Sequence, residues 1–199
     1  NSGAFRMDPD VPLVVPEVNP DAARDRPKGI ISNPNCTTLS MIVVLGALDR
    51  AYSLQRIVVA SYQAASGAGQ AGIDTLRDQI AAVASTDVGD RPGDVRAAIS
   101  DLGPFPAPLA MNVVPWAGSL KEDGYSSEEL KVRNESRKIL GLPELKVSAT
   151  CVRVPVITTH SLAVHAEFAG PVDADEARSL LVNAPGVVVV DDPAALEFP

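Results

Sequence analysis

Hydrophobic positions recur along the chain with two periods, one near 3.6 residues and one of 2, which predict helices and strands respectively. An apolar run follows the turn residues at 33–38 and continues to about residue 52, a length that favours a buried helix. Residues 70–84 carry hydrophobic side chains at helical spacing. Residues 126–140 predict a capped helix, because Ser126 and Glu129 match a capping box and Gly141 fits its end. A last helix is predicted at 173–183.

Strands are predicted where β-branched residues form short runs or alternate with polar ones, at residues 13–15, 29–32, 54–62, 109–114, 145–157, 161–168 and 187–190. The strands at 145–157 and 161–168 are joined at Thr158 and Thr159. Residues 85–108 are rich in Asp, Gly and Pro and predict mostly loop. Together these elements predict an α/β or α+β domain, with a mixed β-sheet and helices packed on it.

Composition and charge argue against several classes of function. The 199 residues suffice for one good-sized domain, or for one domain and a piece of another. A net charge of −8 without a polybasic run argues against nucleic-acid binding, and 4% aromatic residues argue against a stacking platform. No apolar run reaches the roughly 18 residues of a membrane span. Two widely spaced cysteines, Cys36 and Cys151, are most simply thiols in a reducing cytoplasm.

Cys36 is the first candidate for chemistry. It follows an Asn-Pro-Asn turn and opens a predicted helix, where backbone N–H groups and the helix dipole favour a thiolate and lower its pKa. The alternative is a small buried hydrophobic residue, as most unmodified cysteines are. Cys151 lies mid-strand and is interpreted as an inert core residue.

A thiol enzyme needs a base, and the chain has two histidines. His160 lies at a turn between strands, whereas His165 lies mid-strand and is interpreted as structural. Arg153 lies within an apolar strand, where a charge is costly unless it is paired. It is either part of a structural ion pair or a fork that binds a carboxylate.

Two further sets of residues could form part of a binding site. Glu128 and Lys131 share one side of the helix at 126–140, either as a binding pair or as an exposed charge pair. The turn at 66–69 follows a strand and precedes a helix, so it could cradle a phosphate or admit a cofactor ring. Gln63, at the end of that strand, could point into the same cleft.

Taken together and in order, these segments closely resemble bacterial aspartate-semialdehyde dehydrogenases. The matching segments are 1–7 (NSGAFRM), 15–19 (VPEVN), 32–38 (SNPNCTT), 61–69 (SYQAASGAG), 128–131 (EELK), 153–156 (RVPV) and 160–161 (HS). The resemblance runs over nearly the whole chain. One departure is Thr159, where members of the family usually have Gly before the histidine.

The resemblance implies a Rossmann-type NADP-binding domain followed by a catalytic and dimerisation domain. Residues 1–34 would be the C-terminal part of the first, and residues 35–199 the second, with an incomplete C-terminal end. Most of the NADP site would then lie outside this chain, which alone would be inactive. The family enzymes are cytoplasmic homodimers or tetramers that need no metal, and they act on a small molecule, not on nucleic acid or membranes.

The reaction implied is the NADPH-dependent conversion of L-aspartyl-4-phosphate to L-aspartate 4-semialdehyde and phosphate, which feeds lysine, threonine, methionine and diaminopimelate biosynthesis. By resemblance, Cys36 is the nucleophile that forms a thioacyl intermediate, His160 the acid/base, and Gln63 the group that orients the thioester. The resemblance also implies residues that bind the ligands. Arg153 would bind the substrate carboxylate and Glu128 the substrate amino group. The phosphate would be bound by Arg6, Asn35 and Lys131, and the nicotinamide end of NADP would lie near Ser66 and Gly67.

Three rivals compete with this interpretation. Related acyl-phosphate reductases such as the acetyl-glutamyl-phosphate enzyme usually show Gly before the cysteine and Tyr-Pro after it, and neither occurs around Cys36. A non-catalytic dimerising homologue would be expected to lose Cys36 or His160. An unrelated thiol hydrolase has no reason to keep Arg153, Glu128 and Lys131 together.

Overall fold

The computed structural model describes residues 3–198, so Asn1 and Ser2 of the opening motif lie outside the described residues. The helices are α1 (Cys36–Tyr52), α2 (Gly69–Val83), α3 (Asp94–Ala98), α4 (Ser127–Leu140) and α5 (Ala174–Val182). The strands are β1 (Leu54–Gln63), β2 (Lys146–Arg153) and β3 (His160–Phe168). Short 3-10 turns occupy Gly3–Phe5, Pro20–Arg24, Ala65–Ala68 and Glu122–Gly124.

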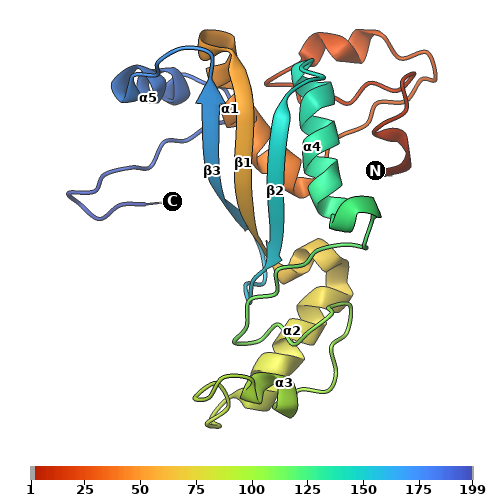
Figure 1. Cartoon of the computed structure of the whole chain (residues 1–199), viewed down its shortest axis with the longest axis vertical. Helices are drawn as coiled ribbons and strands as arrows, with labels where there is room; N and C mark the ends of the chain where they lie inside the picture. Colours follow the sequence, from red (N-terminus) through yellow and green to blue (C-terminus); the bar gives the residue numbers. More distant parts are fainter. Residues whose placement is uncertain (1–2, 199) are drawn as a thin grey trace. The chain divides into compact units, whose positions relative to one another are not determined.

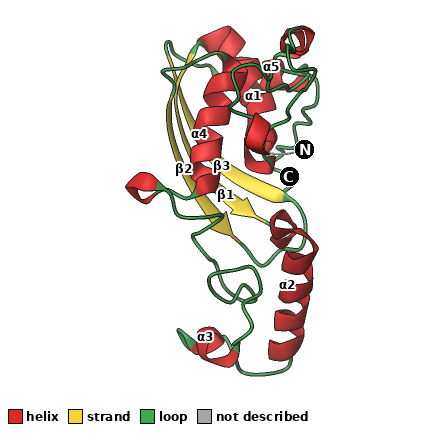
Figure 2. Cartoon of the chain, turned by 90° about the vertical axis from the view of Figure 1, so that its right-hand side faces the viewer, coloured by secondary structure: helices red, strands yellow, loops and turns green. Residues whose placement is uncertain are grey.

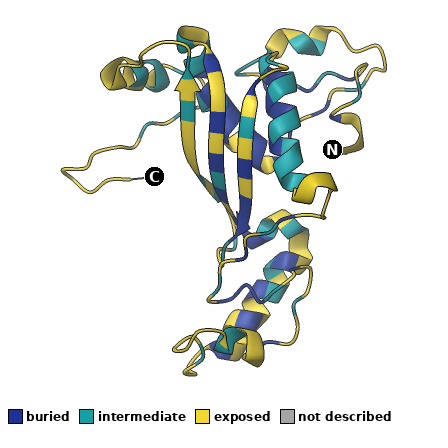
Figure 3. Ribbon diagram, viewed as in Figure 1, coloured by how far each residue is buried: buried dark blue, intermediate teal, exposed yellow. Residues whose placement is uncertain are grey.

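The strands form one sheet in the order β2-β1-β3. β1 and β2 run in the same direction and β3 in the opposite one, so the sheet is mixed, as predicted (Figure 1). Buried and exposed residues largely alternate along β1, the central strand (Figure 3). Because β1 lies between β2 and β3, the strands that follow each other across Thr158 and Thr159 are not hydrogen-bonded neighbours.

The helix ends follow the predicted capping chemistry. In α4, the Ser126 N–H donates to the Glu129 carboxylate at 2.8 Å, and the Glu129 N–H donates to the Ser126 hydroxyl at 3.3 Å. Gly141 follows the helix with a φ of 68°, in the left-handed region that glycine tolerates best. At the start of α1, the Asn35 side chain accepts a 2.7 Å hydrogen bond from the Thr38 N–H.

Contacts divide the chain into two compact units. Unit 1 comprises Asn1–Ile57, Val132–Val147 and His165–Pro199, and unit 2 comprises Val58–Lys131 and Ser148–Val164. The boundary predicted between residues 34 and 35 separates a cofactor-binding domain from a catalytic one. The division by contacts does not test this boundary, which stays a prediction. In unit 1, a buried cluster of Leu13, Val15, Ile42 and Ile139 joins the opening segment to α1 and α4.

Unit 2 is built around α2 and contains much loop (Figure 2). Its core is formed by Ala65, Leu76, Val83, Ile99, Phe105, Leu109, Ala110 and Val114. Gln79, on the buried face of α2, accepts from the Leu109 and Ala110 N–H groups at 2.8 and 3.1 Å. It also donates to the Asp101 carbonyl at 2.8 Å. One glutamine side chain therefore holds the loop of residues 101–110 on the helix.

Four predicted strands are absent or reduced to single bridges, and a fifth is shorter than predicted. Residues 13–15 and 29–32 meet in a single parallel bridge, Leu13 to Ser32, and residues 109–114 contribute only the bridge from Val114 to Arg153. No strand forms at residues 187–190 in the described part of the chain, where Val188 is 86% exposed. Short β-branched runs favour strands only where a neighbour supplies backbone partners. β2 also ends at Arg153 rather than at 157, because Pro155 has no N–H to offer a ladder.

Candidate functional site

Cys36 is the first residue of α1, and its thiol lies at the protein surface. The preceding Asn35 is extended, with φ of −70° and ψ of 165°, and caps the helix. The Asn-Pro-Asn turn thus delivers the sulfur to the helix start, as the sequence predicted. Exposure removes the alternative of a small buried hydrophobic residue, whereas Cys151 is buried, as expected of a core cysteine.

A buried ion pair lies immediately beside Cys36. The Arg6 guanidinium donates from Nη1 to Glu135 Oε1 at 3.2 Å and from Nε to the Asn33 carbonyl at 2.9 Å. The other carboxylate oxygen of Glu135 accepts from the Asn35 N–H at 2.7 Å. Glu135 is only 1% exposed, and this burial raises its pKa against the opposing effects of the Asn35 N–H and the Arg6 charge. Arg6 and Asn35, both predicted site residues, are therefore held by one carboxylate.

Glu135 was missed in the sequence, although a signal was present. Glu128-x-x-Lys131 is repeated seven residues later as Glu135-x-x-Lys138. Seven residues are about two helical turns, so Glu135 and Lys138 lie on the same face of α4 as Glu128 and Lys131. Lys138 donates to the carbonyls of Arg6, Asp8 and Val11 at 2.9, 2.7 and 2.8 Å, and so fixes the segment that carries Arg6.

In unit 2, His160 is the first residue of β3 and is half-buried. Its Nδ1 lies 2.7 Å from the Thr159 carbonyl oxygen and 3.1 Å from the Ala64 nitrogen. The Ala64 N–H has an alternative acceptor, since the Thr159 carbonyl lies 3.2 Å from its nitrogen. Two lone pairs would repel each other at 2.7 Å, so the geometry favours a proton on Nδ1 that is donated to Thr159. In the neutral ring, the lone pair is then on Nε2.

Arg153 is the last residue of β2 and is 8% exposed. Its Nη1 donates to the Ala64 carbonyl at 2.7 Å, so Ala64 contacts both Arg153 and His160 through its backbone. The guanidinium also lies against Gly67, where an added Cβ would come within 3.3 Å of Cζ and closer still to Nη1. The loop Ala65–Ala68 therefore needs its glycine to accommodate the arginine.

The remaining predicted residues of unit 2 lie at the ends of its elements. Gln63 ends β1 and is 1% exposed, and its carbonyl accepts from the Val154 N–H at 3.0 Å. Glu128 and Lys131 form an ion pair in the first turn of α4, with side chains 16% and 40% exposed. The predicted pair is present, with the Glu128 side chain partly buried and the Lys131 side chain more exposed. Glu129, the neighbour of Glu128, serves the capping box and accepts from the Cys151 N–H at 3.2 Å.

The structure brings the predicted residues together as two groups, each within its own unit. Unit 1 holds Arg6, Asn35 and Cys36, and Glu135 joins the first two of them. Unit 2 holds Gln63, Ser66, Gly67, Glu128, Lys131, Arg153 and His160. His165, on the same strand as His160, is largely exposed and lies 3.7 Å from Glu167.

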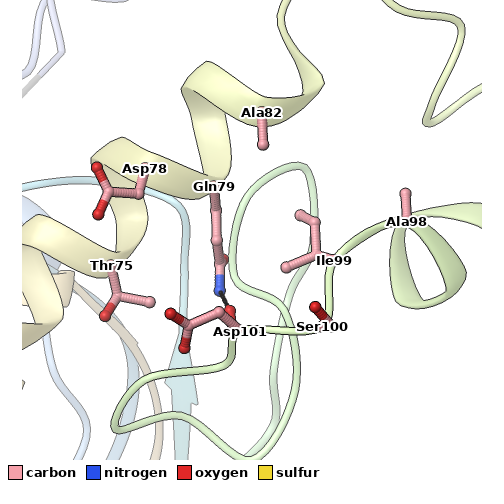
Figure 4. Close-up of a pocket in the computed structure, with 8 residues that line it drawn as sticks. All are labelled: Thr75, Asp78, Gln79, Ala82, Ala98, Ile99, Ser100 and Asp101. Atoms are coloured by element: carbon pink, nitrogen blue, oxygen red, sulfur yellow. Dashed lines mark hydrogen bonds between the residues drawn. The ribbon is translucent and has the colours of Figure 1, made fainter.

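Three further findings on the described residues concern metal clusters, membrane-spanning helices and surface pockets. Within residues 3–198, no cluster of three or more His, Cys, Asp or Glu side chains could hold a metal ion. No helix in this part of the chain is both long and apolar enough to cross a bilayer. A surface pocket of about 230 Å³ lies between α2 and the segment that follows α3 (Figure 4). Its lining, which includes Thr75, Asp78 and Gln79, contains none of the predicted site residues.

Comparisons with known proteins agree with the resemblance seen in the sequence. The model of the semialdehyde dehydrogenase dimerisation domain matches residues 45–199. Aspartate-semialdehyde dehydrogenase of Corynebacterium glutamicum is 51% identical over 198 residues, which are 98% of this chain and 58% of that protein. The Streptomyces akiyoshiensis protein of that name is 51% identical over 200 residues, covering 99% of this chain and 59% of its own length.

Solved structures give the same result. The crystal structure of aspartate semialdehyde dehydrogenase II from Vibrio cholerae matches with a TM-score of 0.84 and 40% identity, covering 94% of this chain and 52% of that one. The chain therefore spans somewhat more than half the length of the curated relatives that it matches. With a family model matched over most of its residues, the chain belongs to the semialdehyde dehydrogenase family.

Proposed function

We propose that the protein to which this chain belongs is an aspartate-semialdehyde dehydrogenase, which converts L-aspartyl-4-phosphate to L-aspartate 4-semialdehyde and phosphate with NADPH. The observation that carries this proposal is the exposed Cys36 thiol at the first position of α1, next to the buried Arg6–Glu135–Asn35 network. The 51% identity with the Corynebacterium glutamicum enzyme supports it.

Cys36 would act as the nucleophile. A helix N-terminus stabilises a thiolate, because its N–H groups and dipole favour negative charge. The thiolate attacks the acyl carbon, a sulfur–carbon bond forms, and the bond from that carbon to the phosphate oxygen breaks. Phosphate leaves, and the aspartyl group remains on Cys36 as a thioester.

Fixed positive groups would bind the phosphate. Arg6 is held by the Asn33 carbonyl and by Glu135, so its guanidinium keeps one orientation. Asn35 and Lys131 complete the proposed phosphate site. Bidentate contacts from a fixed guanidinium suit a phosphate better than a mobile ammonium does.

The amino-acid part of the substrate carries a carboxylate and an ammonium. Arg153 would bind the carboxylate, and its anchoring to the Ala64 carbonyl at 2.7 Å supports a fixed position for this fork. Glu128 would bind the ammonium. Gln63, buried at the end of β1, would orient the thioester.

His160 would move the protons. With Nδ1 hydrogen-bonded to the Thr159 carbonyl, Nε2 is the nitrogen that accepts or donates a proton during the reaction. It would take the thiol proton from Cys36 and, after reduction, return a proton to the departing Cys36 sulfur, while the oxygen of the tetrahedral intermediate forms the aldehyde carbonyl.

The loop with Ser66 and Gly67 would meet the nicotinamide end of NADP. Ser66 is half-buried and Gly67 is exposed, so the loop is accessible to a ligand and fits this role. NADPH, when bound, supplies the hydride that reduces the thioester carbon. Most of its site would lie in the part of the protein outside this chain.

The match to a dimerisation domain supports a homodimer or a tetramer of dimers. We expect the enzyme in the cytoplasm, where Cys36 stays reduced and where lysine, threonine, methionine and diaminopimelate precursors are made.

The test is phosphate-dependent reduction of NADP by aspartate semialdehyde, with the full-length protein. Cys36→Ala should lower kcat by about 10⁴-fold or more, because the covalent route is lost. Cys151→Ala is the matched control, since Cys151 is a buried thiol, and it should retain activity. An inactive, folded wild-type protein would instead favour a non-catalytic homologue or another acyl-phosphate substrate.

A further inference from the structure

We propose that Glu135 is a positioning residue that couples the phosphate site to the nucleophile loop. One oxygen of its carboxylate fixes Arg6, and the other fixes the peptide N–H that directly precedes Cys36. The inference rests on the proposed function, because it assigns Glu135 its task at the phosphate site of that enzyme.

The contacts define what Glu135 does to Arg6. A guanidinium has five N–H donors, and the Glu135 and Asn33 contacts at 3.2 and 2.9 Å fix its plane. Lys138 holds the backbone at Arg6 and in the residues that follow it, through contacts of 2.7–2.9 Å to the carbonyls of Arg6, Asp8 and Val11. Glu135 and Lys138, three residues apart on α4, therefore orient the side chain and the main chain of the same segment.

The charge of Glu135 argues for a geometric role. A carboxylate beside a phosphate site lowers the positive potential there, and burying it costs free energy unless it is well paired. Both oxygens accept from donors in this structure, which is the arrangement of an ionised carboxylate. Such a residue weakens anion binding through its charge, so its benefit must come from the orientation that it imposes.

The second oxygen extends that orientation to the nucleophile. The Asn35 N–H donates to Glu135 at 2.7 Å, and Asn35 is also the cap of α1, so this bond fixes the turn that presents Cys36. Movement of Glu135 would therefore displace Arg6 and the Cys36 turn together.

The test measures phosphate binding without turnover. In the full-length protein, bound phosphate should slow alkylation of Cys36 by iodoacetamide, and mass spectrometry of the Cys36 peptide gives the rate. The phosphate concentration that halves the rate reports affinity. For Glu135→Gln we expect this concentration to rise about tenfold or more, as for loss of a charge-assisted hydrogen bond. Glu135→Asp should recover part of the affinity, and Glu144→Gln, an exposed glutamate, should change nothing.

A second measurement separates positioning from folding. With Glu135→Gln, the KM for phosphate should rise while the KM for aspartate semialdehyde changes less than about twofold. Arg6→Lys cannot bridge Asn33 and Glu135 with a planar fork. If Glu135 acts through Arg6, Glu135→Gln should therefore lower the affinity for phosphate much less in the Arg6→Lys variant than in the wild type.

The outcomes are distinct. Equal phosphate protection in wild type and Glu135→Gln, with only a loss of thermal stability, would overturn the inference and leave the proposed function intact. Wild-type Cys36 that phosphate never protects would contradict the proposed phosphate site, and the inference with it.

Discussion

Thr159 adopts a φ of 73°, in the left-handed region that costs a β-branched residue about 1–3 kcal/mol. The conformation places its carbonyl 2.7 Å from His160 Nδ1. Glycine, the residue that the family resemblance implies at this position, fits this conformation without strain. The departure therefore affects stability more than the orientation of His160, because a glycine would present the same carbonyl.

We predict that Thr159→Gly raises the free energy of unfolding by about 1 kcal/mol, since relief of strain exceeds the added chain entropy. Activity should stay within about twofold, because the hydrogen bond to His160 comes from the main chain. Thr158→Gly is the control, as Thr158 has no positive φ and should lose stability. Denaturant unfolding decides the question, and a destabilised Thr159→Gly would contradict the strain argument.

Glu135 also gives stability a pH dependence. Burial raises its pKa above the ordinary 4.5, so the folded chain holds this proton more tightly than the unfolded chain. The stability that Glu135 contributes is complete below pH 4.5 and is lost as the pH rises through the raised pKa. Glutamine does not titrate, so the Glu135→Gln variant does not lose this contribution. The free energy of unfolding of the variant minus that of the wild type should therefore increase as the pH rises through this range.

Thermal unfolding between pH 4 and 8 measures this difference, with the exposed Glu144→Gln as control. Parallel stability curves for wild type and Glu135→Gln would show that Glu135 has the same pKa in both states.

At the scale of elements, the four longer helices were predicted well because their signals are local, whereas the short α3 lies in a segment that was predicted to be mostly loop. The capping box at Ser126 and Glu129, and the turn before Cys36, depend on residues only a few positions apart. The predicted strand at 187–190 was wrong because pairing depends on a distant partner. The position of β1 between β2 and β3 is likewise a tertiary property that no local pattern indicates.

The same distinction applies to the site. Cys36, Asn35 and His160 lie at turns or helix starts that the sequence marks. Glu135 became important only through contacts with Arg6, 129 positions away, and with Asn35, 100 positions away. Its helical spacing from Glu128 was a hint, but burial of a glutamate cannot be predicted from periodicity alone.

Gln79 gives an element-scale prediction for unit 2. Gln79→Leu should lower the free energy of unfolding by about 3 kcal/mol, because the Leu109 and Ala110 N–H groups lose their acceptor at about 1–3 kcal/mol each. The loop at 101–110 should also become sensitive to limited proteolysis. Asp78→Asn, the neighbouring exposed residue on α2, is the control. An unchanged stability would show that the apolar core alone holds this loop.

At the scale of the whole molecule, the chain spans somewhat more than half the length of its curated relatives, and 98–99% of its own residues align with them. The family model covers residues 45–199, so it begins after Cys36. The proposed nucleophile and phosphate arginine therefore come from the segment before that match, and the histidine and substrate arginine from within it. The family could be recognised from the sequence because its motifs are short, contiguous segments that occur in the expected order along the whole chain.

The proposed reaction depends on Cys36 carrying the acyl group. The most direct measurement mixes the full-length protein with L-aspartyl-4-phosphate in the absence of NADPH, quenches in acid and maps the adduct by peptide mass spectrometry. We predict one aspartyl thioester on the Cys36 peptide, none on the Cys151 peptide, and release of an equal amount of phosphate. An active enzyme with no adduct on Cys36, or with the aspartyl group on Cys151, would contradict this prediction.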